Sequence, residues 1–170
     1  MKPLIARRSR VAAILLLLSG VAAAQDSTKV RTVVRPVLNM YSAPTSDADV
    51  VSQAIYATPV TLLEEKGGWS RIRTPDDYTG WVESSLLVIT AAAEPYGAGK
   101  NVVEIRSLFA HIYRDDSVTT HAPLLTVPFE TRLELDPGTA KPSERWSPVR
   151  LPDGRRAWIQ NGDISTVGVG

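Results

Sequence analysis

The sequence predicts an all-β protein in which two small barrels follow one another after a cleaved signal peptide. Three observations predict this fold. The N-terminal segment is apolar and ends in a row of alanines, the rest of the chain shows no amphipathic helix of normal length, and one tryptophan-containing segment occurs twice. The repeat matters most, because each copy of a repeated segment is one structural unit.

Residues 1–24 have the features of a secretory signal peptide. A basic start at residues 2–10 precedes an apolar run from Val11 to Leu18, and a row of alanines ends at Ala24. The run is shorter than the about 20 residues that a permanent membrane-spanning helix needs. We therefore expect cleavage after Ala24 and a periplasmic or secreted protein with no membrane anchor.

Removal of this segment changes the charge balance. It removes four of the 19 Lys and Arg and none of the 18 Asp and Glu, which leaves 15 basic against 18 acidic side chains, a formal charge of −3. A chain with this balance lacks the basic excess that phosphate backbones attract. We expect no nucleic-acid partner.

Cysteine is absent from the whole sequence. This excludes disulfides, cysteine-ligated zinc and a thiol nucleophile in this polypeptide. The two histidines, His111 and His121, are too few for a histidine-rich metal site, and we expect both on the surface or at strand edges. The sequence predicts no metal, no cofactor and no catalytic residue.

The repeat is strongest in the two segments WSRIRTPDDYTGWV and WSPVRLPDGRRAWI, which begin at Trp69 and Trp146. Six identities recur at an offset of 77: Trp69 and Trp146, Ser70 and Ser147, Arg73 and Arg150, Pro75 and Pro152, Asp76 and Asp153, and Trp81 and Trp158. Upstream the offset shortens to 73 and then 72, where Met40-Tyr41 matches Ile112-Tyr113. The second copy therefore carries insertions, and these fall in connections.

The first copy predicts a barrel over residues 30–89. Val60 to Leu62 alternates with the period of a strand, and Glu64 to Gly68 reads as a tight polar connection into Trp69. Pro75 and Asp76 are typical of a type I turn between two strands. Five short, bent strands closed into a barrel would leave no unpaired strand edge in a unit of about 60 residues.

The second copy predicts a matching barrel over residues 102–166. Leu133 to Leu135 alternates in the same way, and Gly154 can supply the left-handed residue of a bulged hairpin. The insertion lengthens the connection before the tryptophan to ten residues, from Asp136 to Arg145.

Residues 90–101, rich in alanine and glycine, form the predicted linker. Two barrels joined in this way move independently unless a large apolar interface holds them. The apolar stretches at residues 107–110 and 123–129 are candidates for that interface, and also for a docking face toward another domain.

Two tryptophans are candidate ligand contacts. Residues i and i+3 of a strand point to opposite faces, so Trp69 and Trp146 face outward if Ile72 and Val149 face the core. An outward tryptophan beside Arg71 is a plausible platform for a sugar or a peptide. The alternative is that each indole covers a barrel mouth or the other barrel. Trp81 and Trp158 are expected to be packing residues.

The two copies together resemble bacterial SH3-like domains. The pattern of W-S-x-I/V-R, a P-D turn and then G/A-W-V/I carries this resemblance. Residues 39–82, followed by 107–116 and 121–135, resemble the paired SH3-like domains that precede the catalytic domain of NlpC-type cell-wall endopeptidases. The resemblance spans roughly residues 30–165. It implies peptidoglycan, or its stem peptides, as the partner.

The catalytic half of that family has no counterpart here. Its enzymes carry a nucleophilic cysteine in a D-C-S-G motif and a histidine partner, whereas this sequence has no cysteine and its two histidines fall in the second barrel. A thiol mechanism lacks its nucleophile. The prediction is a protein that is not an enzyme by itself.

The resemblance also implies two further site residues. In the family an acidic side chain and a tyrosine of the first SH3-like domain help to recognise the free amino end of the stem peptide. The nearest positions here are Asp49 and Tyr78. A carboxylate facing an ammonium group is suitable chemistry for that role, and the alternative for Asp49 is ordinary loop polarity. Within the repeat, Tyr78 stands where the second copy has Arg155.

Three functions remain in view. The first is a non-catalytic protein that binds cell-wall peptide or glycan, or docks on a cell-wall hydrolase catalytic domain. The second is the N-terminal, substrate-positioning part of an NlpC-type endopeptidase whose catalytic domain is truncated or separately encoded. The third, docking of proline-rich peptides, needs an aromatic groove that one outward tryptophan per copy does not supply.

Overall fold

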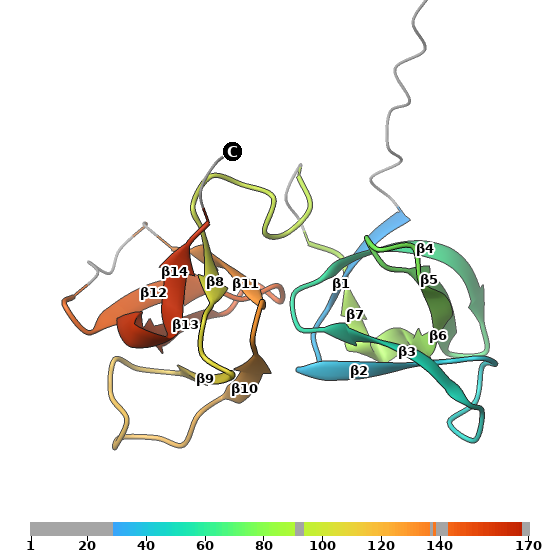
Figure 1. Cartoon of the computed structure of the whole chain (residues 1–170), viewed down its shortest axis with the longest axis horizontal. Helices are drawn as coiled ribbons and strands as arrows, with labels where there is room; N and C mark the ends of the chain where they lie inside the picture. The colour runs from blue at the N-terminus through green and yellow to red at the C-terminus, as the bar shows by residue number, and fades with distance from the viewer. Residues whose placement is uncertain (1–28, 91–93, 137, 139–142, 168–170) are drawn as a thin grey trace, which may run out of the picture.

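The computed structural model describes residues 29–90, 94–136, 138 and 143–167 (Figure 1). The predicted signal peptide, residues 1–24, lies outside this part of the chain. Throughout the described ranges the chain forms β-strands, short 3-10 turns and loops, with no α-helix, so the all-β prediction is confirmed. Accordingly, none of these residues belongs to a helix of the length and apolarity that membrane crossing requires.

The first sheet contains seven antiparallel strands: β1 (Val30–Val33), β2 (Val37–Tyr41), β3 (Val50–Ile55), β4 (Pro59–Lys66), β5 (Trp69–Arg73), β6 (Thr79–Glu83) and β7 (Leu87–Val88). Their order is β3-β2-β6-β5-β4-β1-β7, and the 3-10 turn η2 (Ser84–Leu86) leads into β7. The sheet curls around an apolar interior.

The second sheet also contains seven strands: β8 (Val102–Ile105), β9 (Phe109–Tyr113), β10 (Leu125–Pro128), β11 (Arg132–Leu135), β12 (Trp146–Arg150), β13 (Arg156–Gln160) and β14 (Ile164–Thr166). Their order is β10-β9-β13-β12-β11-β8-β14, which is the order of the first sheet with every label raised by seven. The turn η3 (Asn161–Asp163) stands where η2 stands in the first sheet. The two copies have one topology, as two tandem SH3-like barrels require.

The predicted count of five strands per barrel is wrong. The structure divides each barrel into seven paired segments. Two of the extra segments, β7 and β14, are only two and three residues long and pair with β1 and β8 after the 3-10 turns. Segments this short carry too few residues for an alternating pattern, so sequence periodicity does not reveal them.

Each barrel buries apolar residues at matching positions of the two copies. Ile72 and Val82 have no exposed surface in the first barrel, and Val149 and Ile159 have none in the second. Leu87 is partly buried against the first core. The predicted core positions of Ile72 and Val149 are therefore confirmed.

The repeated P-D turns form the same hairpin loop in both barrels. In the first, the N–H of Asp77 donates to the carbonyl of Thr74 at 3.0 Å, and Asp77 has φ of 66°. In the second, the N–H of Gly154 donates to the carbonyl of Leu151 at 2.9 Å, with φ of 84°. A type I turn followed by a left-handed residue is the expected bulged hairpin.

The predicted connection at residues 64–68 is partly wrong. Strand β4 continues to Lys66, and only Gly67 and Gly68 form the turn into β5. Both glycines have positive φ, 56° and 84°. This is the type I′ geometry of a two-residue hairpin, which glycine adopts without strain. The charged residues before it lie at the end of a strand, where residues 63–66 are all exposed.

The barrels lie side by side and contact each other through the turn after β3 and the linker (Figure 1). Tyr56 and Ala57 of the first barrel pack in one apolar cluster with the core of the second barrel and with Tyr96 of the predicted linker. The Tyr96 hydroxyl donates to the carbonyl of Arg150 and accepts the N–H of Glu134 at 3.1 Å. The described part of the linker is therefore anchored on the second barrel.

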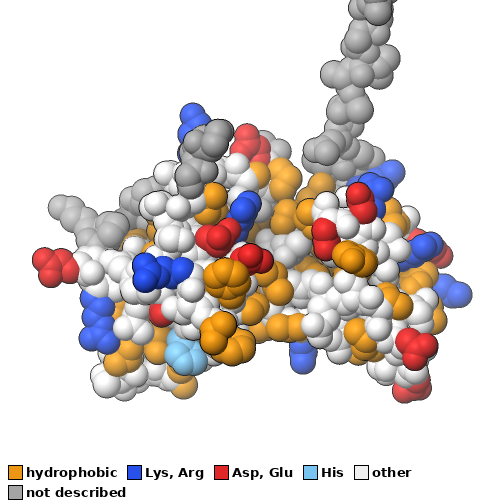
Figure 2. Space-filling model, in the orientation of Figure 1, with side chains coloured by type: hydrophobic (Ala, Val, Ile, Leu, Met, Phe, Trp, Pro, Cys, Tyr) orange, Lys and Arg blue, Asp and Glu red, His pale blue; other side chains and the backbone are white. Residues whose placement is uncertain are grey.

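The two apolar stretches do not form this interface as a whole. Leu108 and Phe109 are 81 % and 67 % exposed, whereas Ala110 and Val127 are fully buried in the second core. Each stretch thus contributes one buried residue to the second core and leaves other residues exposed or half-buried. Figure 2 shows hydrophobic side chains gathered near the junction of the two barrels.

Candidate binding face

The outer surface of the first sheet carries three aromatic side chains on three neighbouring strands. Tyr41 of β2 pairs with Trp81 of β6, and Trp81 pairs with Arg71 of β5. Trp69 lies two residues before Arg71, so alternation places it on the same side of the sheet. We call Tyr41, Trp69 and Trp81 the aromatic face.

Tyr41 and Trp69 contact each other edge to face. Their ring centroids are 5.8 Å apart with an interplanar angle of 87°. Aromatic pairs favour this geometry, because the positive edge of one ring meets the negative face of the other. Both side chains remain partly exposed. Gly67 and Gly68, which precede Trp69, have no side chain to cover the indole.

A shallow cavity of about 210 Å³ adjoins the aromatic face. The residues that line it include Tyr41, Asn39 and two residues of opposite charge, Arg35 and Glu83. Glu83 pairs across strands with Trp69, so its carboxylate lies on the aromatic side of the sheet. The face therefore combines ring surfaces with hydrogen-bonding and charged groups, which suits a polar ligand with apolar faces.

The equivalent surface of the second barrel is closed. Tyr113 and Trp146 repeat the edge-to-face pair, with centroids 5.4 Å apart at 88°. Arg145 lies over the indole, with its guanidinium carbon 5.7 Å from the ring centroid. Trp146 is only 6 % exposed. Trp146 therefore keeps the outer-face ring contact of its counterpart Trp69, but it is not an open platform, because Arg145, at the end of the inserted connection, lies over it, and its ligand contact stays a prediction.

The end of that connection is held in place by hydrogen bonds to the barrel. Arg145 donates to the side-chain oxygen of Gln160 at 3.2 Å. The Nδ2 of Asn161 donates to the carbonyls of Ser143 and Glu144 at 2.9 and 3.1 Å. The N–H of Trp146 donates to the hydroxyl of Ser143 at 3.0 Å. The cover over the indole is part of the folded barrel.

The other two predicted site residues lie in loops of the first barrel. Tyr78 is 58 % exposed in the loop between β5 and β6. Asp49 is exposed just before β3, and its carbonyl accepts the N–H of Ser42 at 2.9 Å. Among the described residues no hydrogen bond or ring contact joins Asp49, Trp69 and Tyr78. Their predicted roles remain predictions.

Sequence reasoning missed Tyr41 as a site residue. The repeat could have indicated it, because Tyr41 and Tyr113 are equivalent positions, as are Trp69 and Trp146. Two aromatic positions that recur together on different strands indicate a ring pair. Trp81 was assigned to packing, and it is partly exposed on the same face.

The histidines form local contacts on the surface. Nδ1 of His111 lies 2.8 Å from the hydroxyl of Thr126, and Nδ1 of His121 lies 2.6 Å from the carboxylate of Asp115. Within the described ranges no three His, Asp or Glu side chains gather as metal ligands. Neither histidine is hydrogen-bonded to a serine, and the chain has no cysteine for a thiol mechanism.

Comparison with known proteins supports the fold and the resemblance. Residues 36–88 match the family model described as bacterial SH3 domain. The chain is 22 % identical over 130 residues to a dipeptidyl-peptidase 6 from Lysinibacillus sphaericus, covering 76 % of this chain and 48 % of that protein. It thus spans about half the length of this relative.

A solved structure shares the architecture. A crystal structure of an NlpC/P60 family protein from Bacillus cereus ATCC 10987 superposes with a TM-score of 0.61 at 20 % identity, covering 80 % of this chain and 55 % of that chain. At this identity the likeness concerns the fold. The chain thus has a tandem SH3-like fold, and its first barrel, at residues 36–88, is similar to bacterial SH3 domains.

Proposed function

We propose that this chain is a non-catalytic protein that binds cell-wall material, either peptidoglycan peptide or glycan, through the aromatic face of its first barrel. The observation that carries the proposal is the partly exposed Tyr41–Trp69 pair, compared with its covered counterpart in the second barrel. Sugar rings and peptide planes stack on aromatic faces, and the Arg71 side chain adds donors beside them.

The polar groups around the aromatic face suit such a ligand. Arg35 and Glu83 supply one positive and one negative group, and Asn39 supplies an amide whose N–H groups can donate, while its oxygen accepts from Nε2 of Gln53 at 2.9 Å. Peptidoglycan offers hydroxyls, amides, carboxylates and amines in close succession. Tyr78 and Asp49, in the loops just before β6 and β3, are proposed as additional contacts to a longer ligand.

The proposal places the protein outside the cytoplasm. Its support is the basic, apolar and alanine-ending segment at residues 1–24, which has the order of a secretory signal. Export would bring the barrels to the periplasm or the cell exterior, where peptidoglycan lies.

Co-sedimentation with purified peptidoglycan sacculi tests the proposal. The protein without residues 1–24 is expected to pellet with sacculi, and Trp69→Ala is expected to lower its affinity for sacculi at least about fivefold, since a stacked ring contributes about 1–3 kcal/mol in comparable sites. Leu108→Ser, which changes an exposed residue of the second barrel, is the matched control and should bind normally. Pelleting no greater than that of an unrelated protein would contradict the proposal.

A second candidate function is to position substrate for an NlpC-type catalytic domain. It is favoured by the match to about half of the dipeptidyl-peptidase 6 and of the NlpC/P60 family protein. Reading the DNA beyond the Gly170 codon in all three frames tests it. A coding stretch with a D-C-S-G motif would support this function, and non-coding sequence in every frame would count against a truncated gene.

A further inference from the structure

A cavity with a positively charged wall lies beside the first strand of the first barrel and shares no residue with the aromatic face. It has a volume of about 290 Å³ and is lined by residues 29–30, 59–61, 73 and 95. Two of these residues are cations, Lys29 and Arg73, and none of the described residues that line the cavity is acidic. Valine and proline side chains form most of the remaining wall. This combination suits an anion that carries an apolar group.

The strand register places Arg73 in this wall. Thr61 of β4 pairs with Val30 of β1 on one side and with Arg73 of β5 on the other. Directly paired residues point to the same face of a sheet, with Cβ atoms about 4.5–5.5 Å apart. Ile72 is fully buried in the core, so its neighbour Arg73 points outward. The three paired side chains therefore form one row on the outer face of the sheet.

The second barrel has the same row with different charges. Val102, Glu134 and Arg150 pair across β8, β11 and β12 in the same register. A glutamate thus replaces the threonine, and Nη2 of Arg150 also donates to the buried carboxylate of Asp136 at 3.2 Å. The first barrel has Leu63 at the position of this aspartate. Carboxylates of its own barrel therefore neutralise the arginine only in the second copy.

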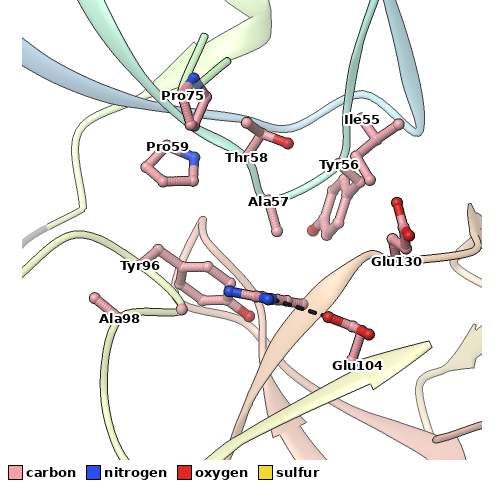
Figure 3. A pocket seen from close by; sticks show the side chains of 12 residues that line it. Ile55, Tyr56, Ala57, Thr58, Pro59, Pro75, Tyr96, Ala98, Glu104 and Glu130 are labelled. Carbon is pink, nitrogen blue, oxygen red and sulfur yellow. Dashed lines mark hydrogen bonds and ion pairs between the residues drawn. The ribbon is translucent and has the colours of Figure 1, made fainter. Parts of the chain in front are cut away.

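The linker covers the row of the second barrel. The Tyr96 hydroxyl accepts the N–H of Glu134 at 3.1 Å, and Oε1 of Glu134 accepts the N–H of Gly97 at 3.0 Å. Figure 3 shows Tyr96 and Pro59 on either side of the larger cavity between the barrels, and Pro59 also lines the smaller cavity. Of the described linker residues, Pro95 alone lines that smaller cavity. The row of the first barrel is therefore left open.

Arg73 has only a weak carboxylate partner. Its Nε lies 3.9 Å from Oδ1 of Asp77, whose side chain is 87 % exposed. Among the described residues the guanidinium makes no hydrogen bond. Exposed pairs of this kind contribute little. The guanidinium carries five N–H donors in a planar fork that matches a carboxylate, and most of them stay available for a ligand.

We propose that this cavity binds a small molecule or a peptide end that carries a carboxylate on a short apolar group. The guanidinium of Arg73 donates to both carboxylate oxygens, the Thr61 hydroxyl donates to one of them, and the apolar group packs against Pro59 and Pro95. Bidentate pairs of this kind are among the strong hydrogen bonds of proteins. Arg73 follows Trp69 by four residues, about 13 Å along an extended strand, so this site is separate from the proposed wall-binding site.

The first experiment compares three probes that share a four-carbon chain. In NMR titrations of the protein without residues 1–24, butanoate should shift the backbone amides of residues 30, 60, 61 and 73. Butan-1-ol and n-butylammonium, at equal concentration, should shift them much less. Equal shifts from the alcohol would show that the charge is not recognised and would overturn the proposal, as would the absence of shifts from butanoate.

Further probes define the anion. Inorganic phosphate offers oxygens to the guanidinium but has no apolar group, so it should bind at least about fivefold more weakly than butanoate. Equal affinity would contradict a carboxylate site with an apolar wall. Nα-acetylalanine represents a peptide end and should bind, whereas its methylamide, which lacks the carboxylate, should not. Binding of butanoate without binding of Nα-acetylalanine would identify a free acid as the ligand.

The second experiment uses variants and the butanoate probe. Arg73→Gln is expected to weaken binding at least about fivefold, because it removes the charged donors, and Arg73→Lys should fall between this variant and the wild type. Arg114→Gln, which removes the same charge at an exposed position of the second barrel, is the matched control. Unchanged binding in Arg73→Gln, or an equal loss in Arg114→Gln, would overturn the proposal.

Two readouts separate this site from a structural role and from wall binding. Asp77→Asn removes the competing carboxylate and should strengthen butanoate binding up to about twofold, whereas a merely structural Arg73–Asp77 pair would give no gain. Trp69→Ala should leave butanoate binding unchanged. Failure of carboxylate binding and failure of wall binding are therefore distinguishable.

Discussion

The two barrels present the same aromatic pair in opposite states. Tyr41 and Trp69 stay partly open, whereas Trp146 of the second pair is 6 % exposed beneath Arg145. The pair geometry is nearly the same, 5.8 Å and 87° against 5.4 Å and 88°. The ring pair is therefore a common feature of both barrels, and the connection before the tryptophan decides whether the rings can contact a ligand.

The largest expected effect comes from truncating the two tryptophans. Trp146→Ala is expected to destabilise the protein by about 3 kcal/mol, and Trp69→Ala by about 1 kcal/mol, because a buried indole loses more packing than a half-exposed one. Urea denaturation checks both values. If Trp146→Ala does not fold, Trp146→Phe replaces it and should still cost more than Trp69→Phe. Equal costs would show that the two sites are packed alike.

The next effect concerns Asp136, where the inserted connection begins. Its carboxylate is 2 % exposed and lies 2.6 Å from Nε of Arg156 and 3.2 Å from an Nη of Arg150. The first barrel has the 45 % exposed Leu63 at this position. Asp136→Asn is expected to cost about 2 kcal/mol at neutral pH, since both arginines are half exposed and the pairs are partly screened. Leu63→Asn is the control and should cost far less.

The same carboxylate predicts a pH dependence. Burial acts to raise the pKa of Asp136, but hydrogen bonds from the N–H of Gly138 and from Arg150, with the charge of Arg156, hold that pKa below its ordinary value. A lowered pKa in the folded state stabilises the protein above the unfolded value of about 3.9. This stability is lost as the pH falls through the folded pKa. Urea midpoints of wild type and Asp136→Asn should therefore converge in acid, and a constant difference would contradict the prediction.

A smaller effect distinguishes the two hairpin loops. Asp77 has φ of 66° where Gly154 has φ of 84°. Asp77→Gly is expected to stabilise the protein by a few tenths of a kcal/mol up to about 1 kcal/mol, because glycine adopts this conformation without strain. Gly154→Ala should destabilise by about 1 kcal/mol. Thermal denaturation checks both signs. Asp77 also forms an exposed ion pair with Arg73, 3.9 Å apart, and its loss is too small to reverse the stabilisation expected from Asp77→Gly.

The smallest effect on stability is expected from uncovering Trp146. Arg145→Ala removes the guanidinium from the ring and should cost about 0.5 kcal/mol. Its main readout is accessibility, measured by acrylamide quenching in a protein whose other three tryptophans are phenylalanine. Quenching of Trp146 should rise toward that of Trp69 measured in the same way. Unchanged quenching would mean that other groups cover the indole.

The repeat made most of the fold predictable. Identities at a fixed offset implied two copies of one unit, and turn residues such as Pro75 and Gly154 marked the hairpin loops. Alternation correctly assigned Ile72 and Val149 to the cores. The strand count was missed, because β7 and β14 are too short to show a period.

The candidate site was predictable only in part. Trp69 was identified from its outward register beside Arg71, and Tyr41 was overlooked although it recurs with its partner in both copies. Contacts between strands that are distant in sequence, such as β2 and β5, depend on how the sheet closes. No local pattern records which outer residues then meet.

The sequence by itself determined the all-β class, the duplication, the hairpin chemistry and the absence of a cysteine nucleophile, because these depend on residue type and spacing. Only the tertiary structure decided that Trp146 is covered while Trp69 is open, and that Tyr56 leaves its own barrel to pack against the second core. Burial is a property of neighbours in space. Two tryptophans in nearly the same local sequence therefore differ in what they can bind.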